Sequence, residues 1–234
     1  ENIYSRGPHF YIYIVMYFGA ILYLSASTVI TAREFQNRSR LLIYPLILFV
    51  MAETIIQVAL PELHVTWLCV TLLSVLYFIY CSEMWNQLDA LTGLLNQNSY
   101  LKQTGGVRYK GGVLVVFDVD DFKQINDRYG HIQGDLCLAG IAECIKKSYA
   151  NFGYCYRIGG DEFCVLLKNG GNEGRCKQEF LQRLQEKRGE IAFLPTVSYG
   201  SAPFSGEDIV KVKDRADQDM YQYKKERKNR KRLS

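Results

Sequence analysis

Two short acidic stretches carry the residues best suited to metal and phosphate chemistry. FDVDD ends an apolar run at residues 117–121, and RIGGDEF places a second pair of acids at residues 161–162. We expect a strand end to present Asp118 and a turn tip to present Asp161, because rigid elements commonly aim reactive groups from such places. Two carboxylates that meet suit Mg²⁺ or Mn²⁺, with the backbone carbonyl of Val119 as a third ligand. The alternative is that the two are unrelated turn acids.

The glycine pair before the second acidic stretch is suited to a phosphate. Gly159 and Gly160 can adopt a positive φ, which lets a phosphate approach bare backbone N–H groups. A lone pair of glycines is a weak signal, but two glycines followed by two acids between β-type runs form a much more specific one.

Three further side chains could read a nucleotide. Lys123 and Asn126 are three apart, so one helix face can present a point charge for phosphate and an amide for a base edge. The carboxylate of Asp135 could accept two N–H bonds from the N1 and N2 edge of guanine, which adenine does not offer. Asp135 could instead, or in addition, be a helix N-cap.

The last amphipathic segment adds cations. It brings Asp217, Lys224 and Lys228, and Lys224 could meet a triphosphate tail. The sequence KKERKNRKR, at residues 224–232, is basic enough to attract nucleic acid or anionic lipid. We expect no nucleic-acid partner, and a solvated basic end at residues 230–234 is the plainest interpretation.

The elements that must position these residues alternate between helix and strand after residue 88. The apolar run 113–120 predicts a buried central strand, and YCYRI, GGDE and FCVLL predict a hairpin. This alternation predicts an α/β (α+β) sandwich with a mixed central sheet flanked by helices. The other predicted elements are helices at about 121–129, 134–149, 177–187 and 207–228, a short helix that Asn98 could cap, and a strand at 196–202.

The first third of the chain is strongly apolar. Residues 10–32, 41–60 and 65–81 contain few charges, and the pattern predicts an all-α segment of three membrane helices within a domain at 1–82. Buried core helices are the alternative. Arginines in the first loop and none in the second place the first loop inside. We therefore expect a multi-pass protein of the bacterial inner (cytoplasmic) membrane, bound to the lipid bilayer, with the N-terminus outside and the catalytic part in the cytoplasm.

Three smaller features complete this picture. Glu53 lies in the middle of a predicted span, where an ionisable group faces a cavity or a helix contact. A helical stalk is expected at 83–92. The absence of an initiator Met suggests a piece of a longer chain, and the seven cysteines form no CxxC pair, so they read as core residues.

Five motifs, in order, resemble one known family. They are DALTGLLNQNSY, FDVDDFKQINDRYGHIQGD, RIGGDEF, VSYGSA and ADQDMYQYKK, and together they resemble the GGDEF family, the diguanylate cyclases. The resemblance covers residues 88–229. It implies a fold akin to the palm of polymerases and nucleotide cyclases, and the condensation of two GTP molecules into cyclic di-GMP with release of pyrophosphate.

The resemblance also assigns roles. It implies that Asp118 and Asp161 bind divalent metal with the Val119 carbonyl, and that Glu162 is required as metal-site or general-base support. It implies that Asn126 and Asp135 read guanine. Phosphate contacts would come from the pair Gly159 and Gly160 and from Lys123, Lys224 and Lys228. Two subunits would face each other as a homodimer, since each holds one GTP, and the stalk could act as a lever for a signal.

The chain departs from the family pattern at three places. The positions of the RxxD inhibitory site hold Ala150 and Gly153, so product feedback through that site is not expected. Where the family has GRN, this chain has Arg227, Lys228 and Asn229, which keeps the charge but loses the arginine fork at position 228. The usual NR of the first motif is also altered.

Other functions stay open from the sequence. A degenerate domain could bind GTP and relay a signal without catalysis, although both Asp161 and Glu162 are present. A relative that makes adenine-containing cyclic dinucleotides is disfavoured by Asp135. A class III purine cyclase shares the chemistry and the fold but not this order of motifs.

Overall fold

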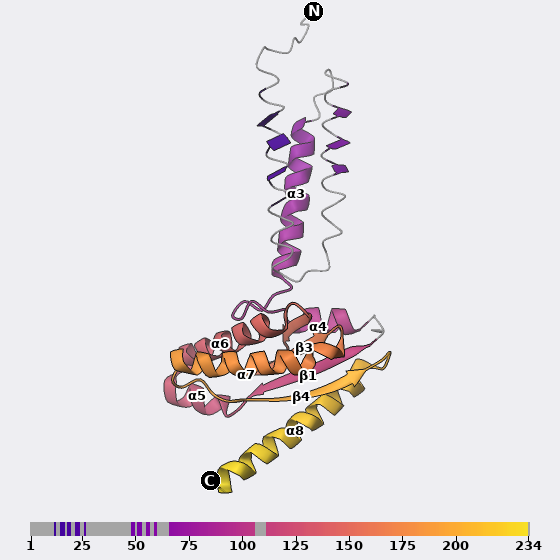
Figure 1. Ribbon diagram of the computed structural model, residues 1–234. Helices are drawn as coiled ribbons and strands as arrows, with labels where there is room; N and C mark the ends of the chain where they lie inside the picture. Colours follow the sequence, from indigo (N-terminus) through magenta and orange to yellow (C-terminus); the bar gives the residue numbers. More distant parts are fainter. Residues whose placement is uncertain are drawn as a thin grey trace, which may run out of the picture. The chain divides into compact units, whose positions relative to one another are not determined.

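The computed structural model describes residues 66–105 and 111–233, together with scattered residues between 12 and 59. The chain divides into two compact units, Glu1–Asn86 and Gln87–Ser234. The first unit contains helix α3, Thr66–Trp85 (Figure 1). The predictions for residues 10–32 and 41–60, including the role of Glu53, fall mainly outside the described residues.

The expected location in the inner membrane is wrong. Across the described parts of the chain, the helices are all too short or too polar to cross a bilayer. In α3 the apolar stretch ends at Cys81 and is followed by Ser82 and Glu83. At 1.5 Å per residue, that stretch rises about 24 Å, which is less than the roughly 30 Å of a bilayer core.

The predicted helical stalk at 83–92 also needs correction. Helix α3 ends at Trp85, and the chain then forms a compact loop closed by hydrogen bonds from Asp89 N to Leu94 O (2.8 Å) and from Asn96 N to Gln87 O (2.9 Å). The Asp89 carboxylate accepts hydrogen bonds from both the backbone N–H and the hydroxyl of Thr92. These local bonds compete with helical ones, so the helix stops.

The second unit is built on a four-stranded sheet, β2 (Gly153–Arg157), β3 (Glu162–Leu167), β1 (Gly112–Val119) and β4 (Val197–Phe204), in that spatial order. All three pairings of neighbouring strands are antiparallel, so the predicted mixed sheet is wrong, whereas the α/β architecture is confirmed. Strands β1 and β2 run in the same direction, but they are not neighbours in the sheet. Strand β3, the second strand of the β2–β3 hairpin, lies between them and is antiparallel to both.

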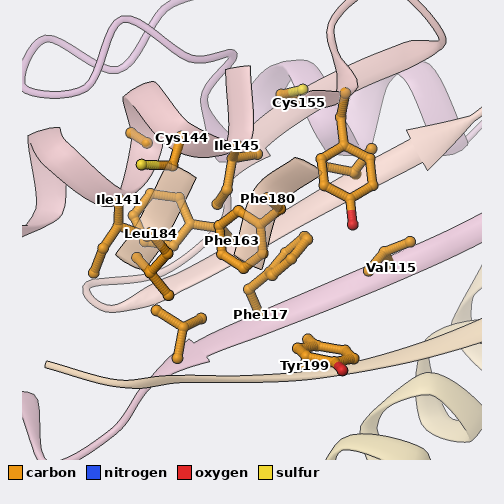
Figure 2. Close-up of a cluster of buried hydrophobic side chains, with 14 of the residues drawn as sticks. Val115, Phe117, Ile141, Cys144, Ile145, Cys155, Phe163, Phe180, Leu184 and Tyr199 are labelled. Atoms are coloured by element: carbon orange, nitrogen blue, oxygen red, sulfur yellow. The ribbon is translucent and has the colours of Figure 1, made fainter. Parts of the chain in front are cut away.

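Helices cover both faces of this sheet (Figure 1). Along β1, Val113, Val115, Phe117 and Val119 face α6 (His131–Tyr149) and α7 (Glu173–Glu190), while Leu114 and Val116 face the other side. That other side is covered by α8 (Ile209–Leu233) and α4 (Gln97–Thr104). Figure 2 shows Phe117 of β1 beside Phe163 of β3 and Phe180 of α7. Both faces of the central strand are therefore buried.

Several element boundaries differ from the sequence predictions. The N-cap of α4 is Asn96 rather than Asn98, and its side chain accepts from Ser99 N at 2.9 Å. Helix α5 (Phe122–Tyr129) follows Asp121, which has a positive φ of 55° and makes no side-chain cap. Helix α6 begins at His131 instead of Gly134. A short 3-10 turn, η2, spans Gly170–Asn172. Helix α8 continues to Leu233, so residues 230–233 are helical and do not form the separate basic tail that the sequence predicts.

Candidate active site at the end of β1 and β3

The antiparallel register of β1 and β3 brings the acidic stretches together. Asp118 lies directly opposite Glu162, so their side chains leave the same face of the sheet. The backbone N–H of Val119 donates to the carbonyl of Asp161 at 3.2 Å. Residues more than forty positions apart in sequence thus become neighbours at one sheet end.

Helix α8 places a cation against the first of these acids. Lys224 Nζ lies 2.6 Å from Asp118 Oδ1 and 3.6 Å from Asp120 Oδ1. Burial acts to lower the pKa of Lys224, but the hydrogen bond to Asp118 and the two negative charges outweigh it and raise that pKa. The ammonium therefore stays charged at the strand end.

Asp120 is the residue that the sequence reasoning missed. Its carboxylate accepts from Thr196 Oγ1 and Ser198 Oγ, both at 2.7 Å, and pairs with Arg227 Nη1 at 2.9 Å. Its side chain is only 12% exposed. Burial and the nearby Arg227 lower the pKa of Arg188, a further guanidinium in this neighbourhood. Two features of the sequence could have indicated this role: the acidic residue Asp120 within FDVDD and the two hydroxyl residues, Thr196 and Ser198, within TVS.

The glycine turn is held by an arginine rather than by left-handed glycines. Neither Gly159 nor Gly160 has a positive φ, so that expectation is wrong. The Gly160 carbonyl instead accepts from Arg157 Nε at 3.2 Å and Nη2 at 2.7 Å, while Nη1 reaches Asp89 at 3.0 Å. A Cβ on Gly159 would lie 3.2 Å from Glu162 Cβ, whereas one on Gly160 would meet open space.

The three candidate nucleotide-reading residues lie on α5 and α6. Lys123 and Asp135 are exposed, and Asn126 is partly buried. Asp135 is the fifth residue of α6, so the alternative of a helix N-cap is excluded. Asp217 pairs with Lys213 at 2.8 Å on α8. Position 228 also lies on α8, but its side chain is outside the described atoms.

Within the described residues, no group of three or more His, Cys, Asp or Glu side chains is arranged to hold a metal ion. The oxygen-bearing side chains at this end of the sheet include those of Asp118, Asp161 and Glu162, and backbone carbonyls such as that of Asp161 lie beside them. This donor set matches Mg²⁺, which keeps several waters and is completed by substrate phosphates, better than it matches zinc.

Curated relatives of this chain are named as diguanylate cyclases. DgcS of Shewanella oneidensis is 32% identical over 154 residues, which cover 62% of this chain and 52% of the relative. DgcP of Pseudomonas aeruginosa is 35% identical over 159 residues, covering 61% and 23% respectively. The chain spans between 21% and 55% of the length of these and similar relatives.

Solved structures show the same fold. The GGDEF domain of DgcB from Caulobacter crescentus, determined in complex with c-di-GMP, matches with a TM-score of 0.52 and 27% identity over 59% of this chain and 90% of that one. The family model described as "Diguanylate cyclase, GGDEF domain" matches residues 86–230, more than half of the chain. With its antiparallel sheet, its GG turn and its paired acids, the chain belongs to the GGDEF-domain family of diguanylate cyclases.

Proposed function

We propose that this chain is a diguanylate cyclase that condenses two GTP molecules into cyclic di-GMP and two pyrophosphates. The observation that supports this most is the location of three acidic residues at the shared end of β1 and β3, where Asp118 lies opposite Glu162 and the backbone of Asp161 bonds to Val119. Relatives named for this activity match across the same part of the chain.

In this proposal Asp118, Asp161 and the Val119 carbonyl hold a divalent cation, Mg²⁺ or Mn²⁺. The ammonium of Lys224, 2.6 Å from Asp118, already puts a positive charge at the carboxylate that the ion would use. A bound ion would supply charge neutralisation for the phosphate oxygens, on which negative charge builds up in the transition state. With an ion at Asp118, the ammonium of Lys224 would be available to contact the phosphates.

The other residues bind and orient the substrate. Asn126 and Asp135 read the guanine edge, since an amide and a carboxylate can accept from its N–H groups. Lys123, Lys224 and Lys228 contact the phosphates. The open space above Gly160 supports a phosphate at the Gly159–Gly160 turn, which has no side chain to exclude it.

The reaction is the same displacement carried out twice. The 3′-hydroxyl oxygen of one GTP forms a bond to the α-phosphorus of the other, the bond from that phosphorus to pyrophosphate breaks, and the hydroxyl proton leaves. Glu162, opposite Asp118, supports either the metal or the transfer of that proton. One such site per chain supplies one GTP, so we propose a homodimer in which two sites face each other.

The test is product identification with a matched variant. The purified chain with GTP and Mg²⁺ should form cyclic di-GMP by mass spectrometry, and Asp161→Ala should form none while its circular dichroism stays that of the wild type. Full turnover by Asp161→Ala would contradict the metal assignment. A wild type that binds GTP but never forms product would favour the degenerate GTP-binding module.

The dimer has its own test. If two chains share each reaction, specific activity rises with protein concentration until the dimer is saturated. Specific activity that stays constant down to concentrations at which sedimentation finds only monomer would overturn the dimer.

A further inference from the structure

Gly134 lies in the interior of α6, where its lack of a side chain needs a reason. It is buried, its φ is not in the left-handed region, and it is followed by fifteen more helical residues. At an ordinary helix position, glycine is less stable than alanine by about 1 kcal/mol. Helix stability alone therefore favours alanine at this position.

The space beside Gly134 is occupied by Asn126. A Cβ on Gly134 would come closer than 3.0 Å to Asn126 Oδ1, a separation that real Cβ atoms do not reach, and would lie 3.1 Å from Asn126 Cγ and 3.2 Å from Phe122 Cζ. The amide of Asn126 thus sits directly against the bare α6 backbone. The two glycines of α7 differ: Gly189 and Gly174 have nothing within 4 Å of such a Cβ.

The two helices cannot easily move apart to make room for a methyl group. They are joined through the single residue Gly130, which has a φ of 85°. Gly130 N donates to Asn126 O at 2.9 Å, and Gly134 N donates to Gly130 O at 3.1 Å. An added Cβ would therefore displace the Asn126 side chain before it displaced the backbone.

The displaced group is one that the protein itself leaves unsatisfied. Asn126 Oδ1 is buried, and no donor reaches it from the part of the chain that the structure describes. A buried acceptor without a partner costs about 1–3 kcal/mol. A ligand N–H that reaches this amide would remove that cost.

We propose that Gly134 is a positioning residue for base recognition: by lacking a Cβ, it lets the Asn126 amide occupy the place from which it reads guanine, next to Asp135. This inference rests on the proposed function, because it assigns a reason for the shape of the same nucleotide site. Gly134 itself contacts no substrate and acts through Asn126.

A double-mutant cycle tests the coupling. The variants are Gly134→Ala, Asn126→Ala and the two combined, with Gly189→Ala as a matched control in open space. The readout is the preference for GTP over ATP, measured both as kcat/KM for cyclic product and as equilibrium dissociation constants by calorimetry. ATP changes the 6-oxygen, the N1–H and the 2-amino group together, so the preference for GTP over ATP reports a contact of Asn126 with any of these three groups.

We expect Gly134→Ala to lower the preference for GTP by roughly tenfold, the effect of one lost hydrogen bond, and by the same factor as Asn126→Ala. The double variant should be no worse than Asn126→Ala alone, and Gly189→Ala should keep the wild-type preference. Unchanged preference in Gly134→Ala overturns the inference, and so does a second, additive loss in the double variant.

The remaining outcomes are also decisive. If Gly134→Ala does not fold but the double variant does, the added Cβ clashes with the Asn126 side chain, as inferred. If neither variant folds, the inference is wrong. If the wild type binds GTP but makes no cyclic product, the proposed activity fails while the calorimetry still decides the role of Gly134. A wild type that does not prefer GTP over ATP in binding overturns the inference itself.

Discussion

Replacing Arg157 with alanine should loosen the glycine turn and weaken the second unit. Its guanidinium ties the Gly160 carbonyl, through Nε and Nη2, to the Asp89 carboxylate, through Nη1. The Arg157 and Asp89 side chains are 15% and 24% exposed, so water only partly screens this pair. One side chain therefore joins the loop at the start of the domain to the turn that carries Asp161.

The expected loss follows from these contacts. A hydrogen bond to a charged group contributes about 1.5–3 kcal/mol. The two bonds to Gly160 share one acceptor, the freed carbonyl can bind water, and Asp89 keeps both bonds from Thr92. We therefore expect Arg157→Ala to lower the free energy of unfolding by about 2–3 kcal/mol, and Arg157→Lys by about 1–2 kcal/mol, since lysine keeps the charge but not the fork.

The same substitution has a pH signature. Burial acts to raise the pKa of Asp89, but the hydrogen bonds from Thr92 and Arg157 outweigh it and lower that pKa below its ordinary value. A carboxyl group whose pKa is lower in the folded protein stabilises the fold at pH values above its pKa in the unfolded protein. This contribution is lost as the pH falls through its pKa in the folded protein. The stability difference between wild type and Arg157→Ala should therefore narrow in strong acid.

The assay is urea unfolding followed by backbone circular dichroism. Both tryptophans, Trp67 and Trp85, lie in the unit Glu1–Asn86, so their fluorescence does not report directly on the sheet. Arg175→Ala is the control, because its ion pair with Glu179 involves a 70% exposed arginine and should change stability by less than about 0.5 kcal/mol. If Arg157→Ala is no more destabilising than this control, the bridge does not hold the turn.

Three other substitutions or treatments test different parts of the fold. Gly200→Ala on β4 would push a Cβ into the backbone of α8 and should destabilise the second unit by about 2–3 kcal/mol, measured by urea unfolding. Hydrogen bonds from Lys147 and Lys187 lower the pKa of Glu143 to about 2, so Glu143→Gln should cost up to about 1 kcal/mol at pH 7 in this exposed network. That cost should disappear as pH falls from 4.5 through 2. Burial raises the pKa of the Cys155 thiol to about 12, so iodoacetamide at pH 8 should leave it unmodified in native protein and label it in urea, as read by peptide mass spectrometry.

Each of these has a clear contrary result. Wild-type stability in Gly200→Ala would mean that α8 does not lie against β4 as closely as described; Gly189→Ala is the control. A Glu143→Gln cost that persists at pH 2 would exclude the ion pairs as its source. Rapid native labelling of Cys155 would show that the sheet opens far more readily than its burial implies.

The local elements of the second unit were predictable because their patterns are strong. The β-branched run at 113–120 and the two β-type runs around GGDE predict β1, β2 and β3 to within a residue or two. The amphipathic last segment gave α8, and the acids at 118 and 161 do reach one end of the sheet. These predictions depend on short-range spacing, which a single sequence contains.

The failures involve tertiary context. Nothing local to Arg157 shows that its side chain, instead of a positive φ, shapes the glycine turn. The role of Asp120 is not visible from the sequence because its partners Thr196 and Ser198 lie 76 and 78 residues away. The antiparallel sheet depends on the position of β3 between β1 and β2, which the sequence does not show. The membrane prediction for the first third of the chain depends on hydropathy alone.

The central claim is that the acidic residues at the end of β1 and β3 form the site that condenses two GTP molecules into cyclic di-GMP. The most direct measurement is the ratio of products that residues 1–234 form from GTP and Mg²⁺, by mass spectrometry for the nucleotide and a coupled assay for pyrophosphate. We predict one cyclic di-GMP and two pyrophosphates for every two GTP consumed, and neither product from Asp118→Asn. Folded wild-type protein that returns its GTP intact, or converts it only to GDP and phosphate, would contradict the claim.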